Sequence, residues 1–323
     1  MTEITIGTRK SKLAMWQAET VAAALAADGM TTRINGMETI GDRVLDTSIA
    51  RIGSKGVFTE ELEAQLAAGA TDIAVHSAKD MQSSLPAGFE LLAFTAREKV
   101  NDVLISDDRT IDIDNIHRPL RIGTSSVRRV ALLRHYYPHL ETVEMRGNLQ
   151  TRIRKMREGA CDALMLAYAG VKRMAYEGLI VKTFAVEEFT PPVGQGCIAI
   201  EAAVSLAPVK RQQIRNCLND PRSEACLTAE RAYLKELEGG CSIPAFGLAV
   251  LAGETLTLRV GLASLDGRQV LRRTMTGPVG EAEHMGRAAG QEILAGGGRQ
   301  LLAEIRRQQA AEVIGTTRPT AGS

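Results

Sequence analysis

Residues 123–129 combine three hydroxyl side chains with two adjacent arginines, in the order Gly-Thr-Ser-Ser-Val-Arg-Arg. A short apolar run precedes them and apolar residues at helical spacing follow, which predicts a strand, a glycine turn and the start of a helix. The first turn of a helix exposes unpaired N–H groups and the positive end of the peptide dipoles, and arginine holds a carboxylate or phosphate through two parallel hydrogen bonds. The stretch therefore suits an anion, although a hydroxyl cap followed by solvated arginines would look the same.

Arginines also follow the ends of other predicted strands. A single arginine at such a place is usually a solvated or ion-paired surface residue. If two lobes turn these strand ends toward one cleft, however, the guanidiniums repel one another unless an anionic ligand balances them. The sequence therefore predicts a polyanionic ligand, bound by a set of arginines: Arg9, Arg128, Arg129, Arg146, Arg152 and Arg173.

The loop after a predicted buried strand at 72–75 carries His76, Lys79 and Asp80. Ligand-binding groups of open α/β sheets come from loops beyond the carboxyl ends of the strands. Lys79 and Asp80 could form an exposed ion pair of little energetic value. Among many arginines, Asp80 would instead be a rare carboxylate, kept ionised by positive charge and able to stabilise a developing cation or pass a proton to an amine. For His76 the favoured interpretation is a structural histidine with a satisfied hydrogen bond.

Cys241 follows two glycines after a predicted helix, in the order Leu-Glu-Gly-Gly-Cys-Ser-Ile-Pro. Free rotation of the glycine backbone leaves the thiol accessible, and covalent attachment needs an accessible thiolate. A plain loop cysteine fits the same residues, and the absence of a nearby histidine in the sequence gives little support to a cysteine hydrolase. The five cysteines are odd in number and form no C-x-x-C pair, which indicates neither a disulfide framework nor a zinc site, so no metal is expected.

The composition of the 323-residue chain is that of an ordinary globular protein, with 45% hydrophobic and 24% charged residues. A net charge of +1 gives no overall field for nucleic acid or an anionic membrane, and 4% aromatic residues argue against base-stacking surfaces. The sequence has no pattern of a signal peptide or of a membrane helix. We expect a soluble, cytoplasmic monomer that binds neither nucleic acid nor membranes.

Strand and helix patterns alternate as far as about residue 200, which predicts an α/β fold of two lobes with mostly parallel sheets. The polar segment 38–56 has no strand or helix period, as a lid or binding loop would. Two consecutive prolines at 191–192 indicate a hinge. From about residue 207 the pattern changes to a small α+β module, and the polar residues beyond about 311 are expected to be disordered.

Seven motifs occur in an order that resembles the porphobilinogen deaminase (hydroxymethylbilane synthase) family, and the resemblance extends from about residue 4 to 310. The motifs are Gly-Thr-Arg-x-Ser at 7–11 with Trp16-Gln17, Gly-x-Lys-Gly-x-Phe at 53–58, His-Ser-x-Lys-Asp at 76–80, Gly-Thr-Ser-Ser-x-Arg-Arg at 123–129, Arg-Gly-Asn-x-x-Thr-Arg at 146–152, Val-Gly-Gln-Gly at 193–196 and Glu-Gly-Gly-Cys at 238–241. So many ordered motifs are a highly specific signal.

The resemblance implies two lobes like those of periplasmic binding proteins and a smaller α+β C-terminal domain. The implied limits are 1–96 with 197–213 for the first lobe, 97–196 for the second, 214–310 for the cofactor domain and 311–323 for the tail. It also implies a dipyrromethane cofactor, made from two substrate molecules and joined to Cys241 by a thioether. The implied reaction condenses four molecules of porphobilinogen head to tail with loss of ammonia. Water then releases the linear tetrapyrrole hydroxymethylbilane, a precursor in haem biosynthesis.

Roles for individual residues follow from the same resemblance. Asp80 would be the catalytic carboxylate, and Lys55 and Phe58 would belong to the lid. The cofactor on Cys241 would be held by Gly240, Lys79, Asp80, Thr124, Ser125, Ser126, Arg128, Arg129 and Arg146. The substrate would be bound by Arg9, Ser11, Gln17, Arg146, Arg152, Arg173 and Gln195. Each pyrrole ring brings two carboxylates, which agrees with the size of the arginine set.

Two other classes of protein are compatible with the residues alone. A two-lobed solute receptor that closes on a dicarboxylate would need no attached cofactor and would release no ammonia. A transferase could instead carry a different group linked to cysteine. The mass of the peptide around Cys241 distinguishes these alternatives.

Overall fold

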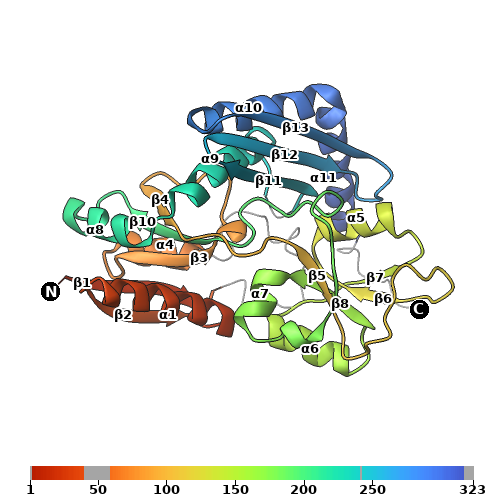
Figure 1. The fold of residues 1–323 in the computed structure, drawn as a ribbon, viewed down its shortest axis with the longest axis horizontal. Helices are drawn as coiled ribbons and strands as arrows, with labels where there is room; N and C mark the ends of the chain where they lie inside the picture. Colours follow the sequence, from red (N-terminus) through yellow and green to blue (C-terminus); the bar gives the residue numbers. More distant parts are fainter. Residues whose placement is uncertain (1, 40–58, 241, 316–323) are drawn as a thin grey trace.

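The computed structural model describes residues 2–39, 59–240 and 242–315, and these contain three β-sheets in three parts of the molecule (Figure 1). Two sheets have five strands each and form two lobes, and the third has three strands and forms the C-terminal domain. The predicted lid residues Lys55 and Phe58 and the predicted attachment residue Cys241 lie outside the described residues.

The first lobe is built on a sheet with the strand order β2-β1-β3-β10-β4. Its strands are β1 (Glu3–Arg9), β2 (Thr31–Met37), β3 (Ile73–Ser77), β4 (Phe89–Phe94) and β10 (Ile198–Ala203). Its helices are α1 (Lys12–Ala27), α4 (Glu60–Ala67) and α8 (Pro208–Leu218). Ile6 of β1, Val21 of α1, Ile200 of β10 and Ile214 of α8 are buried in one hydrophobic cluster, so these elements form the core of the lobe.

The second lobe has a sheet with the strand order β7-β6-β8-β5-β9. Its strands are β5 (Asp102–Ile105), β6 (Arg121–Gly123), β7 (Glu141–Val143), β8 (Ala163–Ala167) and β9 (Ile180–Thr183), and its helices are α5 (Val127–Tyr136), α6 (Leu149–Arg157) and α7 (Tyr168–Arg173). Successive residues of a strand point to opposite faces. Accordingly Leu104 and Met165 lie in one hydrophobic cluster, whereas Ile105 and Leu164 lie in another, and both faces of the sheet are buried.

Each five-stranded sheet has four strands that run in one direction and one strand that is antiparallel to them. In the first lobe β1 is parallel to β2 and β3, whereas β10 is antiparallel to β3 and β4. In the second lobe β6 is parallel to β7 and β8, whereas β5 is antiparallel to β8 and β9. β5 is the first strand of the second lobe, and β10 is the strand by which the chain returns to the first. The prediction of two α/β lobes with mostly parallel sheets is confirmed, with one antiparallel strand in each.

The C-terminal domain consists of an antiparallel sheet covered by helices, which confirms the predicted α+β module. Its strands are β11 (Ala245–Ala252), β12 (Thr255–Ala263) and β13 (Val270–Pro278), and its helices are α9 (Pro221–Glu236), α10 (Ala282–Ile293) and α11 (Arg299–Gly315). The short helices η2 (Glu177–Leu179), η3 (Val279–Glu281) and η4 (Leu294–Gly298) lie in connections. The core of this domain also includes Ala78, Met81 and Val193, so the domain packs against the loop after β3 and the connection between β9 and β10.

Two predicted limits differ from the structure. Helix α8 crosses the predicted boundary between 213 and 214, and its Ile214 and Leu218 are buried in the core of the first lobe. We therefore propose that the C-terminal domain begins at 219–220, just before α9. Helix α11 continues to Gly315, so residues 311–315 are helical and not disordered as predicted.

Candidate functional site

The first lobe contributes the end of β1 and the start of α1 to an open pocket. Ser11 is the N-cap of α1, and its hydroxyl accepts a hydrogen bond at 3.4 Å from the backbone N–H three residues later. Gln17 is buried, and its Nε2 donates to Ser77 Oγ at the end of β3 over 3.0 Å. These three side chains line the pocket together with Arg9 and Asp80. The structure thus brings together four of the predicted site residues of this lobe: Arg9, Ser11, Gln17 and Asp80.

The loop after β3 begins with the short helix η1 (Ala78–Asp80). Ala78 is buried against the C-terminal domain, whereas Asp80 is exposed at the pocket. Burial lowers the pKa of Lys79 to about 8, against the opposing effect of the Asp80 carboxylate and with a further lowering by the Arg129 guanidinium. Because Arg129 belongs to the second lobe, its effect on Lys79 indicates that the two lobes face each other at this loop.

Gly194, in the connection between β9 and β10, supports the backbone of η1. Its φ is +78°, in the region that favours glycine. A Cβ atom at this position would lie 2.8 Å from the carbonyl carbon of Ala78 and 2.9 Å from the nitrogen of Lys79. The absence of a side chain therefore allows the connection between the lobes to touch the loop that carries Asp80.

The hydroxyls of the second lobe organise the corner between β6 and α5. Ser126 is the N-cap of α5 and accepts a hydrogen bond from the Arg129 N–H at 3.5 Å. Thr124 Oγ1 accepts from the Ser126 N–H at 3.3 Å, and Ser125 Oγ accepts from the Met145 N–H at 3.0 Å. These hydroxyls fix the first turn of α5, and Ser125 and Ser126 retain partial exposure.

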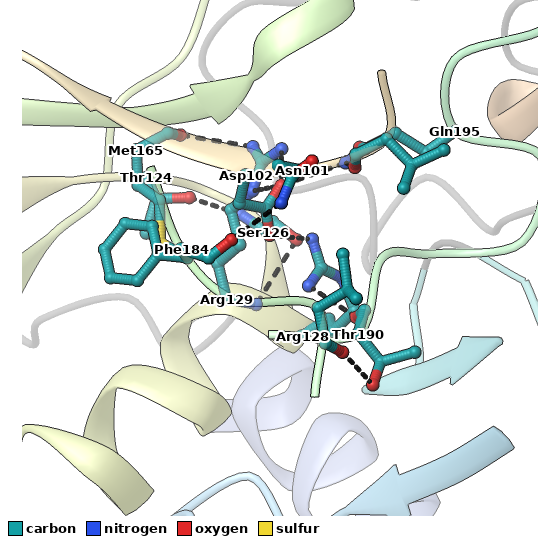
Figure 2. Close-up of polar contacts among 12 residues, drawn as sticks. Asn101, Asp102, Thr124, Ser126, Arg128, Arg129, Met165, Phe184, Thr190 and Gln195 are labelled. Atoms are coloured by element: carbon teal, nitrogen blue, oxygen red, sulfur yellow. Dashed lines mark hydrogen bonds and ion pairs between the residues drawn. The ribbon is translucent and has the colours of Figure 1, made fainter. Parts of the chain in front are cut away.

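Asp102, the first residue of β5, holds both arginines of that corner from inside the lobe (Figure 2). Its carboxylate is fully buried and accepts from Arg128 Nη2 at 2.6 Å and from Arg129 Nε and Nη2 at 3.1 and 2.8 Å. Arg128 Nη1 also donates to the Thr190 carbonyl, and Arg129 Nη1 donates to the Met165 carbonyl. Burial alone raises the pKa of Asp102, but the two guanidiniums outweigh it and hold that pKa far below its usual range.

Sequence reasoning missed the role of Asp102 and expected a ligand to balance these arginines. The structure adds a second partner to this expectation, because the buried Asp102 carboxylate neutralises one of the two guanidinium charges. Two features remain available for a ligand: one net positive charge, and the buried Nε of Arg128, which has no hydrogen-bond partner among the described residues. A lone aspartate at the start of an apolar strand was the only sequence signal, and its partners lie 26 and 27 positions away.

The remaining arginines of the second lobe lie near this centre. Burial lowers the pKa of Arg152 to about 10, with further lowering by Arg129 and Arg146 and an opposing effect of Asp80. Arg152 Nε donates to the Gly147 carbonyl at 2.7 Å. Arg146 Nε lies 2.6 Å from Glu144, at the edge of the same corner. Arg152 of the second lobe and Asp80 of the first are therefore within electrostatic reach of one another.

Arg173 and Gln195 lie where the two lobes join. Arg173 Nη2 donates to the Gly196 carbonyl at 2.8 Å, and its guanidinium lies 5.6 Å from the ring centre of Trp16 in α1. Gln195 is predicted to bind substrate, but only 1% of it is exposed, and its Nε2 donates to the Val100 carbonyl and to Asp102. The structure corrects this prediction: Gln195 is a buried support of Asp102.

His76 forms a buried pair with Glu201 of β10, with 2.9 Å between Nε2 and Oε2. This agrees with the interpretation of His76 as a structural histidine, although its ring also borders the pocket. Glu63 of α4 is buried nearby, and burial raises its pKa, with the Thr59 hydroxyl lowering it and Glu201 raising it further. Neither glutamate was predicted, because single acids in apolar stretches have no distinctive spacing.

The segment that leads to residue 241 is well anchored on both sides. Leu237 and Ile243 are buried in the core of the C-terminal domain, and Glu238 has a positive φ of 47°. A Cβ atom at Gly239 would lie 2.7 Å from Ile243 Cδ1 and 2.9 Å from Leu234 Cδ1, so a side chain at this position would displace the ends of these two side chains. Gly240 is half-buried. Among the described residues no group of three or more His, Cys, Asp or Glu could hold a metal ion, and no helix is long and apolar enough to cross a membrane.

The fold and the site define a two-lobed α/β protein with Lys79 and Asp80 of the first lobe within electrostatic reach of arginines of the second. An α+β domain packs against the loop that carries them. Two family models match the chain. The dipyrromethane cofactor binding domain of porphobilinogen deaminase matches residues 4–210, and the porphobilinogen deaminase C-terminal domain matches residues 224–295. The chain therefore belongs to the porphobilinogen deaminase family, as its motifs predict.

Named relatives agree over nearly the whole chain. The porphobilinogen deaminase of Desulfosudis oleivorans is 59% identical over 95% of this chain and 99% of its own length. That of Cytophaga hutchinsonii is 53% identical over 94% of this chain and 97% of its own length. Among solved structures, a substrate-binding domain of a putative amino acid ABC transporter from Streptococcus pneumoniae has a TM-score of 0.42 and 13% identity, covering 67% of this chain and 91% of that chain.

Proposed function

We propose that this chain is a porphobilinogen deaminase, a transferase that joins four porphobilinogen molecules head to tail, releases one ammonia in each step and frees hydroxymethylbilane by hydrolysis. The observation that carries this proposal is the meeting of cations from both lobes around Asp80. Lys79 comes from the first lobe and Arg129 and Arg152 from the second. The Arg129 guanidinium lowers the pKa of both Lys79 and Arg152, and the Asp80 carboxylate opposes this effect at both residues. A ligand with many carboxylates fits such a cleft.

The donor set fits a dipyrromethane, which carries four carboxylates. Arg129 and Arg146 lower the pKa of Arg152, and Arg128 Nε is buried without a partner among the described residues, so an anion would relieve both conditions. Lys79, Arg146 and Arg152 would hold the carboxylates, with the Ser125 and Ser126 hydroxyls beside them. We propose a thioether to Cys241. The bound group supplies a tethered pyrrole end to which the first substrate is added.

Attachment of the first pyrrole to Cys241 would exchange a carbon–nitrogen bond for a carbon–sulfur bond. The sulfur of Cys241 bonds to the methylene carbon of porphobilinogen, the bond from that carbon to nitrogen breaks, and the amine leaves as ammonia, which takes up the thiol proton. The thiolate is the nucleophile in such a step. The thiol must therefore be accessible to the substrate and cannot be buried in the apolar core.

Asp80 is the proposed catalytic residue. Its carboxylate is exposed at the pocket, while the loop that carries it is fixed by Gly194 and by the buried Ala78. Positive charge develops on the pyrrole ring as ammonia leaves, and a fixed carboxylate beside the ring lowers the energy of that transition state. The same carboxylate can accept the proton that the ring loses on coupling. Arg9, Ser11 and Gln17 would position the incoming substrate in the pocket.

Few large apolar side chains are exposed in the described part of the chain: Ile116, Val204, Val209 and Val250. An obligate interface buries a much larger apolar surface than four such side chains provide, and we propose that the enzyme is a monomer.

The first test is the intact mass of the purified protein. We expect a chain heavier than its sequence by one dipyrromethane, and an unmodified mass for Cys241→Ser. Cys217→Ser is the matched control, because Cys217 is the least buried of the four described cysteines and lies in the first lobe. It should retain the adduct. An active enzyme with an unmodified chain would contradict the proposal and favour a cleft that only binds its ligand.

The second test separates chemistry from attachment. Asp80→Ala should retain the adduct and lose nearly all turnover, since removal of one group that stabilises developing charge costs about 100-fold to 1,000-fold in rate. Release of ammonia and formation of tetrapyrrole measure turnover. Near-normal turnover of Asp80→Ala would exclude the catalytic role.

A further inference from the structure

Helix α11 lies beyond the last residue matched by the C-terminal family model, which ends at 295. Gly296 and Gly297 depart from helical geometry, and Gly297 has a φ of +106°, so the chain turns between α10 and α11. Beyond the turn, Leu301, Leu302 and Ile305 are buried in the core of the C-terminal domain. Helix α11 is therefore an integral element of that domain.

The apolar side of α11 shares its hydrophobic cluster with both flanks of residue 241. Leu237 precedes this position and is 1% exposed, and Ile243 follows it and is 6% exposed. Both belong to the same cluster as Leu302 and Ile305 of α11. Leu237 before Cys241 and Ile243 after it in the sequence therefore pack in the same cluster as helix α11.

Polar side chains of α11 contact the backbone of these flanks directly. Gln309 Nε2 donates to the Ser242 carbonyl at 2.6 Å. Arg306 Nη2 donates to the Leu237 carbonyl at 3.5 Å and lies 3.4 Å from the Glu238 carboxylate. Two residues about one turn apart on α11 thus hold the chain before and after residue 241.

We propose that Arg306 and Gln309 are positioning residues that fix the two flanks of the cysteine so that its thiol can be loaded with the pyrrole cofactor. The inference rests on the proposed attachment to Cys241. It assigns a role in cofactor loading to a helix that neither family model includes. Gln309 makes the larger contribution to this positioning, since its hydrogen bond is the shorter of the two.

The neighbours in the sequence provide matched controls. Residues 306–309 read Arg-Arg-Gln-Gln, so each positioning residue has an identical residue beside it on the helix. Gln308 is exposed, and Arg307 Nε donates to the Ala303 carbonyl of its own helix. Substitution of Gln308 or Arg307 therefore tests the loss of the side chain without the loss of a hydrogen bond to the flanks.

The experiment follows loading of the apo-protein, prepared in cells that cannot make porphobilinogen. The apo-protein is mixed with porphobilinogen, and the gain of mass is recorded against time. We expect Gln309→Ala and Gln309→Glu to gain mass about fivefold more slowly than the unsubstituted chain, as the loss of one hydrogen bond implies. The glutamate variant keeps the size of the side chain but replaces the donor by an acceptor that faces the Ser242 carbonyl. Arg306→Ala should load more slowly to a smaller degree, and Gln308→Ala and Arg307→Ala should load at the normal rate.

A second measurement separates positioning from a general structural role. After complete loading, kcat of Gln309→Ala should equal that of the unsubstituted enzyme, because the thioether then holds the cofactor. Loading of Gln309→Glu at the normal rate, equal slowing in Gln308→Ala, or a reduced kcat after loading would each overturn the inference. If the unsubstituted chain gains no mass at all, the proposed function itself fails, which is a different outcome.

Discussion

At the scale of single residues, Asp102 decides how the arginine corner is built. It is fully buried and balances Arg128 and Arg129, which are 3% and 6% exposed. Removal of one partner from a buried ion pair leaves an uncompensated charge and costs about 3–5 kcal/mol. We predict that Asp102→Asn lowers the free energy of unfolding by about that amount in urea titrations.

The control for this prediction is another aspartate of the same lobe. Asp107 pairs with Arg157 at 2.8 Å, but both side chains are about half exposed, so Asp107→Asn should change the free energy of unfolding by less than about 1 kcal/mol. Equal effects of the two substitutions would contradict the assignment. Because the pKa of Asp102 is lowered by folding, its contribution is complete above the pKa of an unfolded carboxyl, about 3.9, and is lost only as the pH falls through the folded value.

Lys79 gives a prediction for pH dependence. Its pKa is lowered to about 8, so the ammonium that would bind a carboxylate is present below pH 8 and is lost as the pH rises through that value. We predict that kcat/KM, which reports groups of the free enzyme, falls as the pH rises through about 8. Lys79→Arg should remove this inflection, since a guanidinium stays charged. Lys172→Arg is the control, because Lys172 is half exposed and paired with Glu98, and it should keep the inflection.

At the scale of elements, the connection between β9 and β10 positions the loop η1. Gly194→Ala places a methyl group against the backbone of Ala78 and Lys79 and must displace the loop that carries Asp80. A displacement of about 1 Å can cost about 100-fold in rate, so we predict a loss of turnover of at least about tenfold. Gly88→Ala is the matched control: Gly88 also has a positive φ, +96°, but no atom lies within 4 Å of the position that a Cβ would take there. It should lose stability by about 1 kcal/mol and keep its turnover.

The elements were largely predictable from the sequence, because each depends on local pattern. The predicted alternation of strands and helices up to about residue 200 forms the two lobes, and Ser126 caps α5 at the corner predicted at 123–129. The local sequence pattern does not predict the role of a residue whose hydrogen-bond partner is distant in the sequence. The roles of Asp102, Gln195 and Glu201 depend on contacts between segments about 26 to 125 residues apart, which no spacing rule records.

At the scale of the whole molecule, one buried glutamate joins the three parts. Glu230 of α9 has no exposed surface. It accepts hydrogen bonds from Arg97, which lies in the connection that leads to the second lobe, at 2.5 Å from Nη1 and 3.1 Å from Nη2. It also accepts from the Gly194 N–H at 2.9 Å, in the connection that returns to the first lobe, and from the Ala249 N–H at 2.8 Å in β11. Helix α9, which ends at Glu236, is thereby held in a fixed relation to the connection that contacts the loop of Asp80.

Glu230→Gln tests this junction. An amide offers one acceptor oxygen where the carboxylate offers two, so its NH₂ group must face at least one of the donors, and Arg97, which is 12% exposed, loses its countercharge. We predict a loss of about 3–5 kcal/mol in the free energy of unfolding and faster amide exchange in β11 and residues 193–196. Glu283→Gln, which breaks an exposed pair with Arg287 in the same domain, should leave both unchanged. Unaltered exchange at the two connections in Glu230→Gln would mean that the domains are held together by their apolar contacts alone.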